Sequence, residues 1–190
     1  MKRTKKTKIP RILGPDFLPR AEDPELARSV AKELDPLIDA LRGDVKEFNT
    51  LTDRARLSRT LIQRGELELL CGSAAHAPAD FEEARALLEV DARSAPLMLL
   101  DARGAWVDVL HGKPARAQRT LEALLEREED VTVRGWRDQL LLWLAAAHVA
   151  QNQPDAARAC LAQALEIYEQ EPRRKRHLVD AAWARLAVQK

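Results

Sequence analysis

The sequence predicts an all-α protein: an α-solenoid of about three helical hairpins, with one helix before the hairpins and a capping helix after them. The main observation is an internal repeat. HGKPARAQRTLEALLE, which starts at His111, recurs as QNQPDAARACLAQALE at Gln151, an offset of 40 residues. Such a period is typical of repeat proteins, whose units bury their apolar faces on one another. Composition agrees, because aromatic residues make up only 4% of the chain and strands favour aromatic and β-branched residues.

The charge distribution divides the chain into a basic flexible arm, residues 1–21, and a helical repeat domain, residues 22–190. Residues 1–11 contain six Lys or Arg and no acid, whereas the whole chain has a net charge of only +1. Pro10, Pro15 and Pro19 prevent a helix in the arm. The second half of the arm is more apolar and is suited to extended packing along a surface.

The sequence is that expected of a cytoplasmic protein without a membrane partner. Cys71 and Cys160 form no spaced disulfide framework, which fits a reducing compartment. No apolar run of a signal peptide follows the basic start. The longest apolar run, residues 140–147, is too short to cross a bilayer.

Proline, glycine and acidic residues set the expected helix ends in the first half of the chain. Asp23, Pro24 and Glu25 predict a helix start. Pro36 should kink or restart this helix, and Gly43 should close it. A second helix should run from about residue 45 or 52 to residue 70.

The second half of the chain is expected to hold two further hairpins. Asp80 should cap the helix that precedes them, after a loop at residues 72–80. The paired helices are predicted at 97–111 with 115–128, and at 136–150 with 155–170. Residues 130–135 should link the two hairpins, and residues 177–189 should form the last helix.

These units resemble the tetratricopeptide repeat, a hairpin of about 34 residues with small residues where its two helices cross. The third unit matches at Leu141, Leu144, Ala145, His148, Asn152, Ala157, Leu161 and Ala164. The second matches at Asp101, Ala105, Gly112, Ala117 and Leu121. The first matches at Gly65, Gly72, Ala84, Leu88 and Pro96 when its turn is lengthened.

The chain also departs from the family pattern. The usual Trp and Tyr positions hold Asp101, Leu141, Asp108 and His148, and the period is 40 residues. A generic α-solenoid with similar units therefore stays open as an alternative.

The resemblance implies that the first helix of each hairpin lines a concave groove. Its candidate binding residues here are Arg59, Gln63, Glu66, Arg103, Trp106, Gln139 and Trp143. Arg and Trp dominate the energetics of protein interfaces, so Arg103 with Trp106 is a candidate hot spot. The competing interpretation is that the tryptophans pack between helices. The leading hypothesis is an adaptor or scaffold that holds a peptide or helix of another protein in this groove.

Other hypotheses use other parts of the chain. Lys2, Arg3, Lys5, Lys6 and Lys8 are candidate phosphate contacts of a nucleic-acid-associated protein, or simply a solvated tail. A secretion-type chaperone of similar size and repeat number is a further alternative. Self-association through Leu178, Trp183, Leu186 and Val188 would give a homo-oligomer.

The sequence contains no motif that points to an enzyme. It has no Gly-rich phosphate loop, nucleophile elbow or His-Glu-x-x-His pattern, and its four histidines are widely scattered. Cys71 and His76 are too few for a zinc site. We therefore expect no catalytic residues, no cofactor and no metal.

Overall fold

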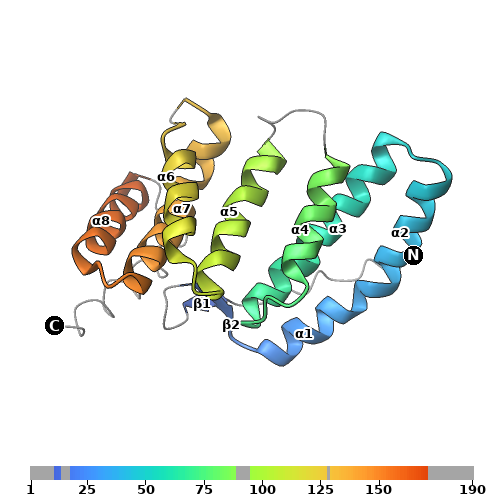
Figure 1. Cartoon of the computed structure of the whole chain (residues 1–190), viewed down its shortest axis with the longest axis horizontal. Coiled ribbons are helices and arrows are strands. Elements are labelled where there is room, and N and C mark those ends of the chain that lie inside the picture. The colour runs from blue at the N-terminus through green and yellow to red at the C-terminus, as the bar shows by residue number, and fades with distance from the viewer. Residues whose placement is uncertain (1–10, 14–17, 89–94, 128, 171–190) are drawn as a thin grey trace.

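The computed structural model describes residues 11–13, 18–88, 95–127 and 129–170 (Figure 1). Within these ranges the protein is all-α apart from one short strand pair, as the sequence predicts. The helices are α1 Pro24–Glu33, α2 Asp35–Glu47, α3 Leu51–Leu70, α4 Ala77–Leu87, α5 Ala95–Leu110, α6 Pro114–Leu125, α7 Val131–Ala150 and α8 Pro154–Gln170. They follow one another across the molecule from α1 and α2 at one end to α8 at the other (Figure 1).

Three helical hairpins, α3–α4, α5–α6 and α7–α8, form the repeat. Their first helices end at Leu70, Leu110 and Ala150, so the 40-residue period extends to all three units. The link at 111–113 is short and α7 has 20 residues, so the second interval is long because of its helix. The first interval is long because its links, 71–76 and 88–94, are longer.

The same turn closes the first helix of every hairpin. Gly72, Gly112 and Asn152 have φ angles of 76°, 71° and 56°, in the left-handed region. In each turn the next residue donates its N–H to a carbonyl five residues earlier, as Lys113 does to Asp108 at 2.7 Å. These are the bonds of a Schellman motif, which satisfies carbonyls at a helix end. The first unit differs only in that α4 begins later, so its turn is lengthened as the resemblance requires.

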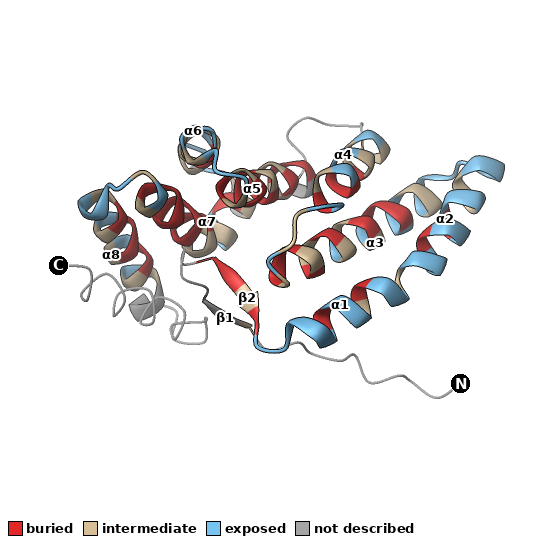
Figure 2. Ribbon diagram, turned by 60° about the horizontal axis from the view of Figure 1, so that its bottom comes forward, coloured by how far each residue is buried: buried red, intermediate tan, exposed pale blue. Residues whose placement is uncertain are grey.

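Small residues lie where the two helices of a hairpin cross. Ala105, Ala117, Ala145 and Ala157 are at most 1% exposed. A methyl side chain lets two helix backbones approach closely, and larger side chains of the neighbouring turns fill the remaining space. In Figure 2 the buried residues concentrate on α5 and α7, whereas α1 and α2 are mostly exposed.

A short β-hairpin packs against the helices. Strand β1, Arg11–Leu13, pairs antiparallel with β2, Pro19–Ala21. Leu18 is fully buried, and Arg20 Nη1 donates to the Leu69 carbonyl at 3.2 Å. The sequence gives no clear alternation that would predict these strands, and tertiary packing stabilises them. The expected domain division after residue 21 stays a prediction, and the structure adds that residues 18–21 lie against the helices.

Three expected helix boundaries were wrong, and several others were confirmed, among them the start of α1 at Pro24 and the end of α3 at Leu70. Gly43 does not close α2, which continues to Glu47, and Asn49 takes the left-handed φ of 49° beyond it. Asp80 does not cap α4, because the helix begins at Ala77. The break between α1 and α2 confirms the restart expected from Pro36.

The predicted linker at 130–135 is the third error. Asp130 caps α7, since its Oδ1 accepts the Thr132 N–H at 2.8 Å, and the helix runs from Val131. The sequence reading missed this aspartate as an N-cap. The last predicted helix, residues 177–189, lies outside the described residues.

Candidate partner-binding surfaces

The first helices of the three hairpins bring most of the predicted groove residues together. Glu66 of α3 forms an ion pair with Arg103 of α5, where Arg103 Nε donates to Glu66 Oε1 at 2.8 Å. The Arg103 guanidinium lies over the ring of Trp136 on α7, 5.5 Å from its centroid. One arginine thus connects α3, α5 and α7 through a charge pair and a cation–π contact.

The tryptophans form the buried part of this face. The rings of Trp106 and Trp143 stack with centroids 5.5 Å apart, and the two residues are 2% and 3% exposed. Among the described residues, the Nε1 atoms of both rings and Nε2 of Gln139 are buried without a hydrogen-bond partner. A buried donor left unpaired costs about 1–3 kcal/mol, so these three groups are notable in a packed core.

The remaining predicted residues are more accessible. Arg59 and Gln63 are exposed on α3, and Glu66 and Gln139 are half-buried. The structure therefore separates the predicted site into a buried floor, Arg103 with Trp106 and Trp143, and an accessible part. Whether this face binds a partner stays a prediction.

The sequence reading missed Trp136 as a member of this face, because it took the preceding residues for a linker. The available signal was spacing, since Trp136 and Trp143 are seven residues apart and residues at i and i+7 share a helix face.

Several candidate residues fall outside the described residues. These are Lys2, Arg3, Lys5, Lys6 and Lys8 of the basic arm, together with Leu178, Trp183, Leu186 and Val188 of the proposed self-association surface. The nucleic-acid and self-association hypotheses therefore stay predictions.

The described histidine and cysteine side chains have structural surroundings. His148 is 6% exposed, and its Nδ1 lies 2.8 Å from Gln153 Oε1. Burial raises the pKa of the Cys160 thiol to about 11, which disfavours the reactive thiolate. Within the described ranges no three His, Cys, Asp or Glu side chains are grouped as metal ligands. No helix in the same ranges is long and apolar enough to span a bilayer.

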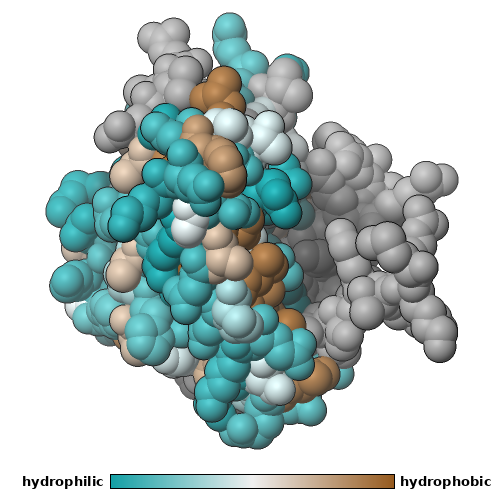
Figure 3. Space-filling model, turned by 90° about the vertical axis from the view of Figure 1, so that its right-hand side faces the viewer, coloured by the Kyte–Doolittle hydropathy of each residue, from teal (hydrophilic) through white to brown (hydrophobic). Residues whose placement is uncertain are grey.

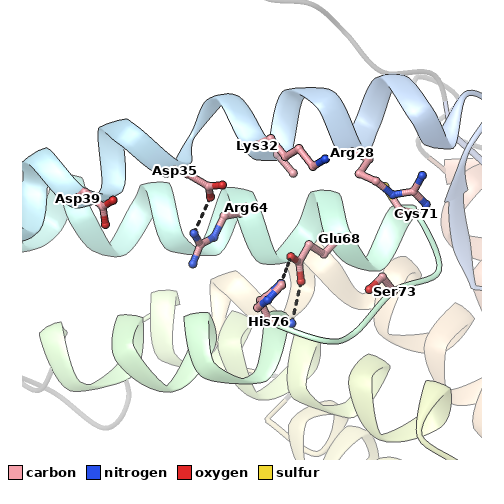
Figure 4. A pocket seen from close by; sticks show the side chains of 10 residues that line it. Arg28, Lys32, Asp35, Asp39, Arg64, Glu68, Cys71, Ser73 and His76 are labelled. Atoms are coloured by element: carbon pink, nitrogen blue, oxygen red, sulfur yellow. Dashed lines mark hydrogen bonds and ion pairs between the residues drawn. The ribbon is translucent and has the colours of Figure 1, made fainter.

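A cleft that the sequence did not predict lies between α1–α2 and α3. Its volume is about 510 Å³, and the loop before α4 closes one side. Ten residues line it: Arg28, Ala31, Lys32, Asp35, Asp39, Arg64, Glu68, Cys71, Ser73 and His76. Figure 4 shows charged side chains of both helical walls around this space.

Arg64 and Glu68 fix the α3 wall of the cleft. Arg64 Nε donates to Asp80 at 2.8 Å, and its Nη1 donates across the cleft to Asp35 at 2.8 Å. Glu68 accepts the His76 backbone N–H at 3.0 Å, and its other oxygen lies 2.7 Å from His76 Nδ1. The first set of bonds ties α2, α3 and α4 together, and the second holds the loop against α3.

The outer face at the α2 end is mostly hydrophilic, with hydrophobic side chains that lie apart from one another (Figure 3). The exposed large hydrophobic residues among those described are Leu26, Leu37, Phe48 and Leu51. Single apolar side chains on a surface are ordinary, and a docking patch is usually contiguous. We therefore assign no site to them.

Comparison with known proteins identifies the repeat in the second half of the chain. Residues 108–178 match the model of the tetratricopeptide repeat family, which covers the end of α5 and all of α6, α7 and α8. No curated protein and no solved structure matches the chain. Tetratricopeptide repeats generally mediate protein–protein interactions, which supports an adaptor or scaffold role for this chain.

Proposed function

Because residues 108–178 form a tetratricopeptide-like repeat, we propose that this protein is an adaptor that binds a peptide or helix of a partner protein. The partner would lie on the face made by α3, α5 and α7. The observation that carries this proposal is the joining of Glu66, Arg103 and Trp136, one from each of these helices. A face held rigid in this way needs little reordering when a partner binds.

The residues of this face would have different roles. Trp106 and Trp143 are packed too tightly to contact a partner directly, so we assign them to the floor that fixes the spacing of α5 and α7. Arg59 and Gln63 lie on successive turns of α3, are exposed, and would contact the partner. Gln139 is half-buried and its Nε2 is buried without a hydrogen-bond partner, so we assign it to the same floor rather than to the contact surface.

This division of roles decides the experiment. Replacing Trp106 would damage the core, so loss of binding would not distinguish a contact from a folding defect. The double variant Arg59→Ala/Gln63→Ala removes two exposed side chains and leaves the floor intact. Arg119→Ala/Arg127→Ala is the matched control, since both arginines are exposed on the α6 side of the repeat.

The measurement is affinity purification from native lysate, at low and high salt, with the full chain and with a chain lacking residues 1–11. We expect a protein partner that survives high salt, does not need residues 1–11, and is lost with Arg59→Ala/Gln63→Ala but not with the control. Retention of that partner by the double variant would contradict the proposed face. Recovery of nucleic acid alone, only with residues 1–11 present and only at low salt, would favour the basic arm instead.

A further inference from the structure

We propose that the partner of the face made by α3, α5 and α7 is an acidic segment, whose carboxylates pair with Arg56 and Arg59 and whose apolar side chains contact Leu99 and Trp136. This inference rests on the proposed function, because it names the chemistry of the partner bound at the same face. The observation that carries it is a pair of exposed arginines. Neither Arg56 nor Arg59 has an ion pair or a side-chain hydrogen bond with the part of the chain that the structure describes.

The two arginines lie on the side of α3 that faces α5. Arg56, Arg59, Gln63 and Glu66 follow one another at spacings of three, four and three residues, which places them on one stripe of the helix. Glu66, at one end of the stripe, accepts from Arg103 Nε of α5 at 2.8 Å. The stripe therefore leads from this ion pair to exposed positive charge at its other end.

The acids of α3 leave this charge in surplus. Residues 51–63 of the helix contain three arginines and one acid, a net charge of 3 − 1 = +2. That acid, Asp53, takes part in the N-terminal cap of the helix. Glu66 is balanced by Arg103, and Glu68 lines the cleft toward α1 and α2.

The acids of α5 and α7 do not offset the surplus either. On α5, Asp101 and Asp108 pair with arginines of α4 and α6. The only acid of α7 is Asp138, which lies about 100° around the helix from Gln139, away from Trp136 and the face. The described part of the face is therefore positively charged, and the ligand that complements it is anionic.

The repeat places apolar residues beside this charge. Under the 40-residue period, Arg59 corresponds to Leu99 and Gln139 of the next two units, and Arg56 corresponds to Trp136 of the third. Leu99 and Trp136 are both half-buried. A segment that crosses from α3 to α7 would therefore meet cations first and apolar surface next. An acidic segment with apolar residues beside its acids fits this order.

The two parts of the face should respond differently to salt. An exposed ion pair contributes at most a few-fold in affinity, and salt screens it. Contacts with Leu99 and Trp136 do not depend on charge. Binding of an acidic partner should therefore weaken in high salt without being lost, as the high-salt purification requires.

The test uses three capped, fluorescent peptides of Ser that differ only in charge. Each has two Leu near one end, and the other end holds two Glu, two Gln or two Lys. Fluorescence polarisation with the full chain should show the Glu peptide binding about tenfold more tightly than the Gln peptide, because each of two ion pairs contributes a few-fold. The Lys peptide should bind most weakly. No binding of the Glu peptide, or equal binding of all three, would overturn the proposal.

Charge reversal then locates the site. Arg56→Glu/Arg59→Glu should move the preference to the Lys peptide. Arg56→Gln/Arg59→Gln should abolish the preference, which provides a second variant should the first fail to fold. The control Lys46→Glu/Arg119→Glu makes the same change in net charge as the reversal, at exposed residues of α2 and α6, and should keep the Glu preference. Circular dichroism confirms folding of each variant.

Two results of these variants would contradict the site. An equal shift in the control would show attraction to overall charge alone. A Glu preference that survives the reversal at Arg56 and Arg59 would show that acidic peptides bind elsewhere, as on the basic arm.

The inference and the proposed function can fail separately. Peptides that bind equally whatever their charge, and are all lost with Arg59→Ala/Gln63→Ala, would overturn the acidic partner and leave the face as proposed. A preference that the reversal inverts, together with a lysate partner that Arg59→Ala/Gln63→Ala retains, would support the acidic site and contradict the proposed function.

Discussion

Gly65 of α3 lies directly against the ring of Phe81 on α4. A Cβ atom added at Gly65 would lie 2.6 Å from Phe81 Cε1 and 3.0 Å from Cζ. Phe81 is 4% exposed, so its ring has little room to move. This contact sets the distance between the two helices of the first hairpin, in the role that alanines have in the other two.

Gly65→Ala should therefore destabilise the protein although alanine favours helix. Overpacking a core costs about 1–3 kcal/mol, which exceeds the gain of up to about 1 kcal/mol from helix propensity. Gly43→Ala is the matched control, because Gly43 also lies within a helix and a Cβ there has no neighbour within 4 Å. Urea denaturation should show a lower free energy of unfolding for the first variant and a higher one for the second. A stabilised Gly65→Ala would show that the ring moves freely.

Gly112 and Asn152 occupy equivalent left-handed positions after α5 and α7, and substitutions there should change the free energy of unfolding in opposite directions. Gly112→Ala should lower the free energy of unfolding by about 1 kcal/mol, because alanine is strained at a φ of 71°. Asn152→Gly should be neutral or slightly stabilising, since glycine adopts a φ of 56° without strain. Thermal denaturation of the two variants tests this. A destabilising Asn152→Gly would show that the asparagine side chain contributes more than its backbone conformation.

The stacked Trp106 and Trp143 should stabilise the folded protein through the packing of their rings rather than through their N–H groups. Trp106→Ala should cost about 3–5 kcal/mol, because it leaves a large cavity against Trp143. Trp106→Phe keeps a ring in the stack and removes a donor that has no acceptor among the described residues. We expect Trp106→Phe to lower the free energy of unfolding, measured by chemical denaturation, by less than about 2 kcal/mol. Equal losses in the two variants would indicate that the indole N–H has a partner.

The pair of Arg42 and Glu83 should make a small part of the stability depend on pH. Arg42 Nε donates to Glu83 Oε1 at 2.9 Å, and this bond holds the pKa of Glu83 below its ordinary value of 4.5. A lowered pKa in the folded state means that the contribution is full above pH 4.5 and disappears as the pH falls through the folded-state pKa.

Because Glu83 is about one-third exposed, we expect the wild type to exceed Glu83→Gln by less than about 1 kcal/mol at pH 7. The difference should shrink toward pH 3 and in high salt. Urea denaturation at several pH values measures it, and a difference that persists at pH 3 would contradict the assignment.

Local sequence determined the hairpins of the second half of the chain. The turns predicted at 112–114 and 151–154 are present, with Gly112 and Asn152 in the left-handed region, and the second helices begin one residue before the predicted 115 and 155, at Pro114 and Pro154. Turn chemistry and helix starts depend on neighbouring residues, so a single sequence is enough to find them. The errors at Gly43 and Asp80 involve contacts between helices, since Val45 packs against the core beyond Gly43 and Asp80 binds Arg64 of α3 instead of capping α4.

What only the tertiary structure decided is which residues meet across helices. The sequence placed Arg103, Trp106 and Trp143 on first helices, but it did not show that the rings are buried or that Arg103 joins Glu66 to Trp136. The packing of the strand pair against α3, through Arg20 and the Leu69 carbonyl, and the cleft between Lys32 and Glu68 likewise arise from segments distant in the sequence. The sequence by itself determined the helices and their period, because these follow from interactions within a few residues. The burial of the rings and the shape of the cleft were decided by packing between helices, which no local pattern encodes.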